Sequence, residues 1–178
     1  SQTARASSGV RPTAARPWLC WSGPRTADRF WRRQALFALS YSCYYSGDFD
    51  SALEAAGRLD ALGETTGSRR ARANAAMMAG LSYATRGDWE AGIQACERAL
   101  DLSPDPFETA WILACLGKAH AEGGDAAQAI PLLEQAVELA DQVRSLQLRC
   151  WFRTMLGDAY LLGGQMDKAR AVAGQALD

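Results

Sequence analysis

The sequence predicts an all-α protein built as an α-solenoid, in which antiparallel pairs of helices stack one after another. The first observation is composition: 34 of the 178 residues are alanine, which has the highest helix propensity, and β-branched residues are scarce. The second is a pattern of small residues that recurs every 37–40 residues through most of the chain. A period of this length is typical of stacked helical repeats.

Composition and charge argue against several classes of protein. The formal net charge is −1, so a generally basic nucleic-acid-binding surface is not expected. No apolar run approaches the roughly 20 residues that a membrane-spanning helix requires. The 5 cysteines are odd in number, widely spaced and without a CxxC pair, which is typical of free thiols in a reducing compartment. We therefore expect a cytoplasmic protein that binds neither nucleic acid nor a membrane.

The start of the chain differs in composition from the rest. Residues 1–27 contain no Asp or Glu but four arginines and three prolines. We expect residues 1–28 to form a poorly ordered segment, although an Arg-rich and acid-poor composition also fits an organelle transit peptide. Trp18, Leu19 and Trp21 are unusual in such a segment. We therefore expect them to dock on an apolar surface, either of this chain or of a partner.

Residues 29–178 predict four helix-turn-helix units. Their approximate limits are residues 29–64, 68–104, 106–141 and 144–178. Each unit has a small residue within its first helix, at Ser40, Gly80, Gly117 and Gly157. Seven residues later each unit has a glycine, at Gly47, Gly87, Gly124 and Gly164. Another small residue follows five positions further on, at Ala52, Gly92, Ala129 and Ala169.

Each of these positions has a physical reason. The first small residue allows the two helices of a unit to approach closely, and the last one packs the second helix against the first. The glycine between them ends the first helix, where a positive φ is favoured. Asp48, Asp88 and Asp125 directly follow three of these glycines. We expect each aspartate to cap the second helix of its unit by accepting a hydrogen bond from a free backbone N–H.

The order of these residues resembles the tetratricopeptide repeat. The second unit matches best, with Gly80, Tyr83, the run Gly87-Asp88-Trp89, Gly92, Ala99 and Pro104. The first unit departs most, because Ser40, Cys43 and Leu59 stand where the family has glycine, an aromatic residue and alanine. The resemblance implies a right-handed superhelix. Its period is 37–40 residues instead of about 34, which is similar to the long-period arrays of bacterial signalling regulators.

The resemblance also implies where a partner would bind. In this family the first helices of the units line a concave face, and the inward positions are here mostly aromatic or apolar. The residues expected to bind a partner are Phe37, Tyr41, Tyr44, Tyr45, Met77, Met78, Leu81, Trp111, Lys118, Trp151, Met155 and Asp158. Such side chains are typical of binding hot spots. We expect a helix or an extended apolar peptide of a protein partner, because the cationic cluster with which some family members hold a C-terminal carboxylate is missing.

Two alternatives stay open at this point. The apolar face can instead be covered by the N-terminal segment, or by a second copy of the chain in a homodimer. The last helix carries Val172 and Leu177 without a polar capping helix, which favours a longer array or an end-to-end dimer. The function is either that of a non-catalytic scaffold or that of the regulatory part of a larger signalling enzyme or transcription regulator.

No catalytic site is expected. The single histidine, His120, falls in the position that Tyr83 and Tyr160 occupy in other units, so we expect it to pack between helices. The aspartates after the turns are interpreted as helix caps, and no glycine-rich phosphate-binding motif is present. We therefore expect no enzymatic activity, no cofactor and no metal.

Overall fold

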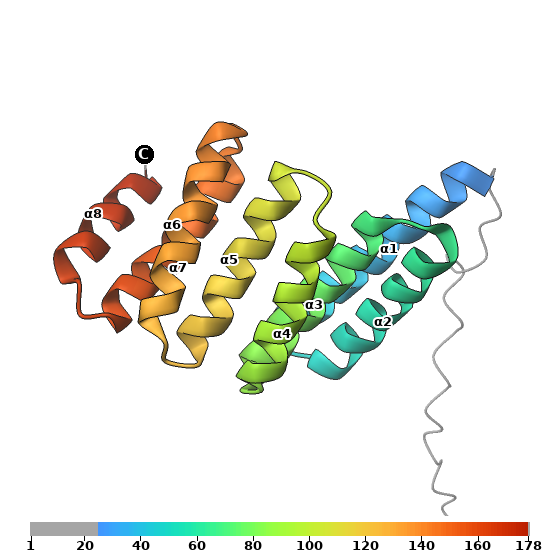
Figure 1. Cartoon of the computed structure of the whole chain (residues 1–178), viewed down its shortest axis with the longest axis horizontal. Helices are drawn as coiled ribbons and strands as arrows, with labels where there is room; N and C mark the ends of the chain where they lie inside the picture. Colours follow the sequence, from blue (N-terminus) through green and yellow to red (C-terminus); the bar gives the residue numbers. More distant parts are fainter. Residues whose placement is uncertain (1–24, 178) are drawn as a thin grey trace, which may run out of the picture.

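The computed structural model describes residues 25–177, which form eight α-helices and no strand. The helices are α1 (Arg25–Tyr45), α2 (Phe49–Thr66), α3 (Arg69–Arg86), α4 (Trp89–Leu102), α5 (Pro106–Glu122), α6 (Ala126–Gln142), α7 (Leu146–Leu162) and α8 (Met166–Leu177). They form four pairs that follow one another along the long axis of the molecule (Figure 1). The predicted all-α solenoid of antiparallel helix pairs is confirmed.

Each odd-numbered helix is in contact with several others. It packs against its partner in the pair and against the neighbouring odd-numbered helices, and from α3 onward also against the second helix of the preceding pair: α3 contacts α1, α2, α4 and α5. The odd-numbered helices therefore form one continuous inner layer, and the even-numbered helices form the outer layer.

The first helix begins earlier than the sequence predicts. Residues 25–28, which we assign from composition to the poorly ordered segment, belong to α1. Asp28 lies in the first turn of this helix and pairs with Arg32 one turn later at 2.9 Å, an arrangement that stabilises a helix start. Trp18, Leu19 and Trp21 lie outside the described residues.

The turns within the pairs have the expected geometry. The four glycines that end the first helices have φ between 70° and 97°. Asp48 accepts a hydrogen bond from the Ser51 N–H, and Asp125 accepts one from the Gln128 N–H, each at 3.1 Å. The capping hydrogen bond predicted for Asp88 is wrong. Asp88 precedes α4 with backbone torsions like those of Asp48, but its side chain accepts no hydrogen bond from the helix.

The two helices of a pair come closest at the small residues. A Cβ atom built on Gly80 would lie 2.3 Å from the Cys96 Sγ atom and 2.9 Å from the Gly92 carbonyl oxygen. Ser40 is fully buried at the corresponding position and donates to the Ala52 carbonyl at 2.8 Å, so its hydroxyl is satisfied in the interface. In the last pair the contact is looser, since a Cβ on Gly157 would lie 3.5 Å from Val172.

This difference predicts opposite effects for two matched substitutions. Gly80→Ala should lower the free energy of unfolding by about 1–3 kcal/mol, because backbone atoms of α4 block the added methyl group. Gly157→Ala should be neutral or should raise it by up to about 1 kcal/mol, because the methyl group fits and alanine favours the helix. Urea denaturation followed by circular dichroism measures both. Equal effects of the two changes would contradict the packing described for Gly80.

Burial also predicts the reactivity of the thiols. Cys96 and Cys115 are fully buried, and burial raises the pKa of the Cys96 thiol to about 12 and that of Cys115 well above its usual value. Cys43 and Cys150 are half-buried. In the folded protein, iodoacetamide should modify Cys43 and Cys150 well before Cys96 and Cys115, and denaturant should remove the difference. Peptide mass spectrometry gives the order, and early labelling of Cys96 would contradict it.

Candidate peptide-binding groove

A chain of aromatic rings runs along the inner layer. Tyr41 of α1 contacts Trp111 of α5, with ring centroids 6.4 Å apart, and Trp111 contacts Trp151 of α7 at 5.0 Å. The first of these contacts joins two helices that are separated in the layer by α3. Rings from three inner helices therefore meet on one surface.

The side chains of helix α3 are small enough for the neighbouring helices to cover them. Much of its length is Ala, Gly or Ser, so large side chains of α1 and α5 reach over it, and Tyr41 meets Trp111 there. Met77, Met78 and Leu81 are consequently no more than 1% exposed, and Tyr41, Tyr44 and Trp111 pack against the cluster that contains them. The expectation that Met77, Met78 and Leu81 line an accessible partner-binding face is thus incorrect: these side chains form the core.

The remaining predicted residues lie at or near the surface. Phe37, Tyr41 and Tyr44 are half-buried on α1, and Tyr45 is 56% exposed at the end of this helix. The rings of Tyr41 and Tyr45 lie 4.6 Å apart, and burial together with a hydrogen bond to Tyr41 raises the pKa of Tyr45. These four residues form an aromatic cluster on α1.

A largely apolar pocket is formed by residues of α1, α5, α7 and α8. Its volume is about 480 Å³, and Tyr41, Trp111 and Trp151 form its aromatic wall. The other lining residues are Gln147, Leu148, Cys150, Thr154 and Ala176. Sequence reasoning did not select Gln147 or Cys150, although Gln147 precedes Trp151 by one helical turn and continues the same stripe of α7.

A second pocket lies between α5 and α7 and is charged. It has a volume of about 260 Å³ and is lined by Lys118, Ala121, Glu122, Met155, Asp158 and Leu162. Lys118 forms an ion pair with Glu122, and Asp158 is exposed. Both pockets are lined by residues of α5 and α7, and we call them together the α5–α7 groove. Its aromatic end is the first pocket, and its other end carries one more acidic than basic side chain.

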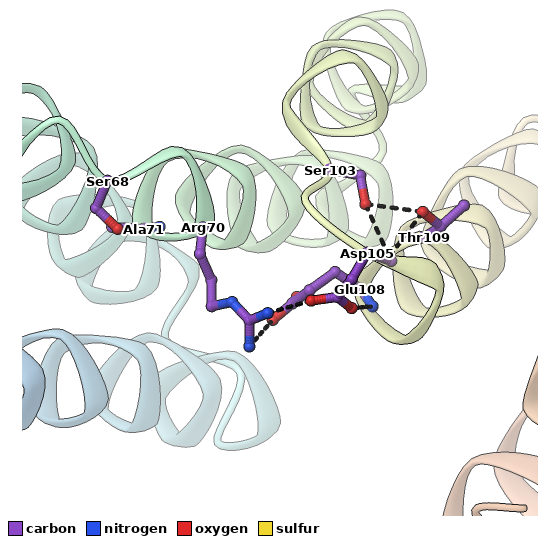
Figure 2. Close-up of polar contacts among 7 residues, drawn as sticks. All are labelled: Ser68, Arg70, Ala71, Ser103, Asp105, Glu108 and Thr109. Atoms are coloured by element: carbon purple, nitrogen blue, oxygen red, sulfur yellow. Dashed lines mark hydrogen bonds and ion pairs between the residues drawn. The ribbon is translucent and has the colours of Figure 1, made fainter. Parts of the chain in front are cut away.

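A polar cluster fixes the N-terminal ends of the helices next to this groove (Figure 2). Arg70 of α3 pairs with Asp105 and, at 3.6 Å, with Glu108 of α5. Asp105 also caps α5 by accepting from the Glu108 N–H at 3.0 Å. Thr109 donates to the Asp105 carbonyl at 2.9 Å and lies 2.8 Å from the Ser103 hydroxyl, which orders the turn before α5.

Burial sets the electrostatics of this cluster. Glu108 is 7% exposed, and burial raises the pKa of its carboxyl group, while the nearby Arg70 opposes the rise. Burial and the positive charge of Arg70 both lower the pKa of Arg33 on α1. Arg70 of α3 and the carboxylates next to the beginning of α5 therefore meet at one charged site, which ties these two helices together. Sequence reasoning missed this cluster.

The residues that could be considered for catalysis or metal binding belong to the helical framework. The Nδ1 atom of His120 lies 3.9 Å from a carboxylate oxygen of Asp125, across the turn between α5 and α6. Within residues 25–177 no three His, Cys, Asp or Glu side chains are grouped so as to hold a metal ion. None of the described helices is long and apolar enough to cross a membrane.

Paired helices, glycine turns and one inner layer define a helical-repeat solenoid. Residues 71–142 match the family model of the tetratricopeptide repeat. The crystal structure of MamA is similar, with a TM-score of 0.56 and 21% identity over 82% of this chain and 76% of that one. So is a putative kinesin light chain of Podosopora anserina with nearly identical TPR-like repeats, with a TM-score of 0.65 and 19% identity over 82% of this chain and 73% of that one.

These comparisons show the fold. Residues 71–142 are similar to tetratricopeptide repeats, and the helices on either side continue the same solenoid. The identities to the solved structures are low and bear on the fold alone. A comparison with curated proteins finds no match. Tetratricopeptide repeats are in general non-catalytic interaction modules.

The polar cluster gives a prediction with a defined pH dependence. Arg70→Met removes the cation beside a buried carboxylate and should lower the free energy of unfolding at pH 7 by about 1–3 kcal/mol. Without Arg70 the folded-state pKa of Glu108 rises further above its unfolded value, so the folded state binds the proton more tightly. The deficit should therefore shrink as the pH falls towards about 4, where Glu108 becomes neutral.

Urea denaturation at the two pH values measures this change. Arg170→Met is the matched control, because the Arg170–Asp167 pair is exposed and should contribute little. A deficit for Arg70→Met that is the same at both pH values would contradict the role assigned to Glu108.

Proposed function

We propose that this chain is a cytoplasmic, non-catalytic scaffold that binds a segment of a protein partner in the α5–α7 groove. The observation that carries the proposal is the aromatic pocket formed by Tyr41, Trp111 and Trp151, which opens beside an acidic one. A segment with a bulky apolar anchor and a basic residue fits both ends.

The aromatic end supplies the larger part of the binding energy. Trp and Tyr side chains dominate binding hot spots, because they bury a large area at a low cost in conformational entropy. Trp111 and Trp151 are half-buried and held by neighbouring rings, so they are ordered before a partner arrives. The amide of Gln147 and the hydroxyl of Thr154 line the same pocket and can hydrogen-bond the backbone of a bound segment.

The charged end sets the preference for a basic residue. Glu122 is already paired with Lys118, whereas Asp158 is exposed at the surface of the same pocket. A Lys or Arg of the partner would lie between these two carboxylates. The same arrangement disfavours a C-terminal carboxylate, since Lys118 is neutralised and Asn74 is buried in the core.

Two substitutions test the two ends of the groove. Peptides selected from a random phage-displayed library against the full chain serve as the probe. Trp151→Ala should weaken their binding by at least about tenfold, which is about 1.4 kcal/mol. Asp158→Lys should weaken the binding of peptides with a basic residue and favour those in which this residue is replaced by Glu. Isothermal titration calorimetry measures both.

Trp89→Ala is the matched control, because Trp89 is 45% exposed on α4, outside the groove. It should leave the affinity unchanged. Circular dichroism confirms that each variant is folded. Affinities that are unchanged in both Trp151→Ala and Asp158→Lys would overturn the proposed function.

A further inference from the structure

The segment that precedes α1, outside the described residues, has the composition that the α5–α7 groove favours. Arg16 stands two positions before Trp18, and Leu19 and Trp21 follow. Residues 1–27 contain no Asp or Glu, so no negative charge in this segment opposes its approach to the acidic end of the groove. A bulky apolar anchor next to a basic residue is what the two ends of the groove accept. The chain therefore carries its own candidate occupant for this site.

An apolar stripe on α1 leads from the first turns of the helix to the aromatic pocket. Phe30, Phe37 and Tyr41 are spaced by seven and four residues, so they lie on one side of the helix. Phe30 is 48% exposed, and Phe37 lies beside Tyr41 with ring centroids 6.2 Å apart. Tyr41 in turn contacts Trp111 at the pocket. Apolar side chains from the segment ahead of α1 can pack along this stripe as far as the groove.

The length of the segment matches the distance to the pocket. Helix α1 begins at Arg25, and Tyr41 lies sixteen residues further on, about 24 Å along the helix axis. An extended chain spans about 3.3 Å per residue, so the seven steps from Arg25 back to Trp18 cover about 23 Å. Trp21, about 13 Å from Arg25 by the same count, falls within the apolar stripe. The segment is thus long enough to bring Trp18 to the pocket of its own chain.

The order of the charges agrees with this direction. The first helices of all pairs run the same way, so Asp158, seven residues after Trp151, lies about 10 Å further from the helix starts and on nearly the same side of α7. Arg16 lies about 7 Å beyond Trp18 when the segment runs along α1, and its long side chain covers the rest. The Trp18 ring and the Arg16 guanidinium therefore reach the aromatic and the acidic end in the order in which the groove presents them.

Another hollow of the array suits this segment less well. It measures about 580 Å³ between α2, α3 and α4, and Tyr83 is the one aromatic side chain among the described residues that line it. Its Asp60 carboxylate already lies 3.5 Å from Arg72 and 3.9 Å from Arg98. A basic segment would compete with two arginines there, whereas the α5–α7 groove offers three aromatic rings and the exposed Asp158.

We propose that residues 16–21 occupy the α5–α7 groove of their own chain, with Trp18 in the aromatic pocket and Arg16 beside Asp158. The contact is autoinhibitory, because a partner segment enters the groove only when this segment leaves it. The apparent affinity for a partner is then the intrinsic affinity reduced by the fraction of chains whose groove is open. This regulation rests on the proposed function, since it concerns the same groove.

Two native cysteines allow the docked segment to be detected directly. Cys20 stands two residues after Trp18, and Cys150 lines the aromatic pocket and is half-buried. Oxidation of the dilute full chain with diamide should join Cys20 to Cys150 within one molecule, which a non-reducing gel and peptide mass spectrometry identify. Trp18→Ala keeps both thiols and should slow this linkage at least about fivefold. Trp89→Ala is the matched control and should leave the rate unchanged.

Three results of the oxidation would overturn the regulation. The first is that no bond forms between Cys20 and Cys150, and the second is that it forms as fast in Trp18→Ala. The third is a bond that joins two chains, which would place the segment of a second copy in the groove. Circular dichroism confirms that both variants are folded.

The peptides selected against the full chain measure the consequence for partner binding. They should bind Trp18→Ala about fivefold more tightly than the wild-type chain, the factor for a groove that is occupied in four of five molecules. Arg16→Glu should also tighten their binding, whereas Arg5→Glu, the same change outside residues 16–21, should not. The chain linked through Cys20 and Cys150 should bind them only after the disulfide is reduced.

The two measurements separate a failure of this regulation from a failure of the proposed function. Peptide binding that depends on Trp151 but is the same in Trp18→Ala would overturn the regulation and leave the scaffold function intact. A bond between Cys20 and Cys150 that depends on Trp18, in a chain that binds no selected peptide, would instead support the docked segment and overturn the function.

Discussion

The close approach of paired helices at one small residue per repeat is the constraint on which the rest of the structure depends. At Gly80 the backbones of α3 and α4 come so near that even a methyl group meets the Gly92 carbonyl oxygen. This contact sets how closely the two helices of a pair approach each other. The glycine turn that follows sets the direction of the second helix. Because every pair is built in the same way, the pairs present equivalent surfaces to each other and stack as a solenoid.

The position of the groove follows from the size of the side chains in the inner layer. The small residues of α3 let side chains of α1 and α5 cover Met77 and Met78, which become core. Between α5 and α7 the inner residues are larger, and Trp111 and Trp151 line a pocket at the surface. The polar cluster of Arg70, Asp105 and Glu108 ties the beginning of α5 to α3.

Local sequence patterns predicted the helices, the turns and the stacking, because each depends on residues within one repeat. The burial of Met77, Met78 and Leu81 could not be predicted in this way. Their position in the repeat says which side of α3 they occupy, but their burial depends on the side chains of α1 and α5 that cover them. Arg70 and its partners escaped notice for a related reason, since Arg70 and Asp105 are 35 residues apart and meet only when two repeats are stacked.

The contact between Tyr41 and Trp111 has a consequence for how the array unfolds. In an ideal solenoid each repeat touches only its neighbours, so its stability is a sum of local terms and its ends can open independently. Here the first repeat touches the third across the second. The first repeat should therefore not open independently of the second and third, because this contact is kept only while all three are folded.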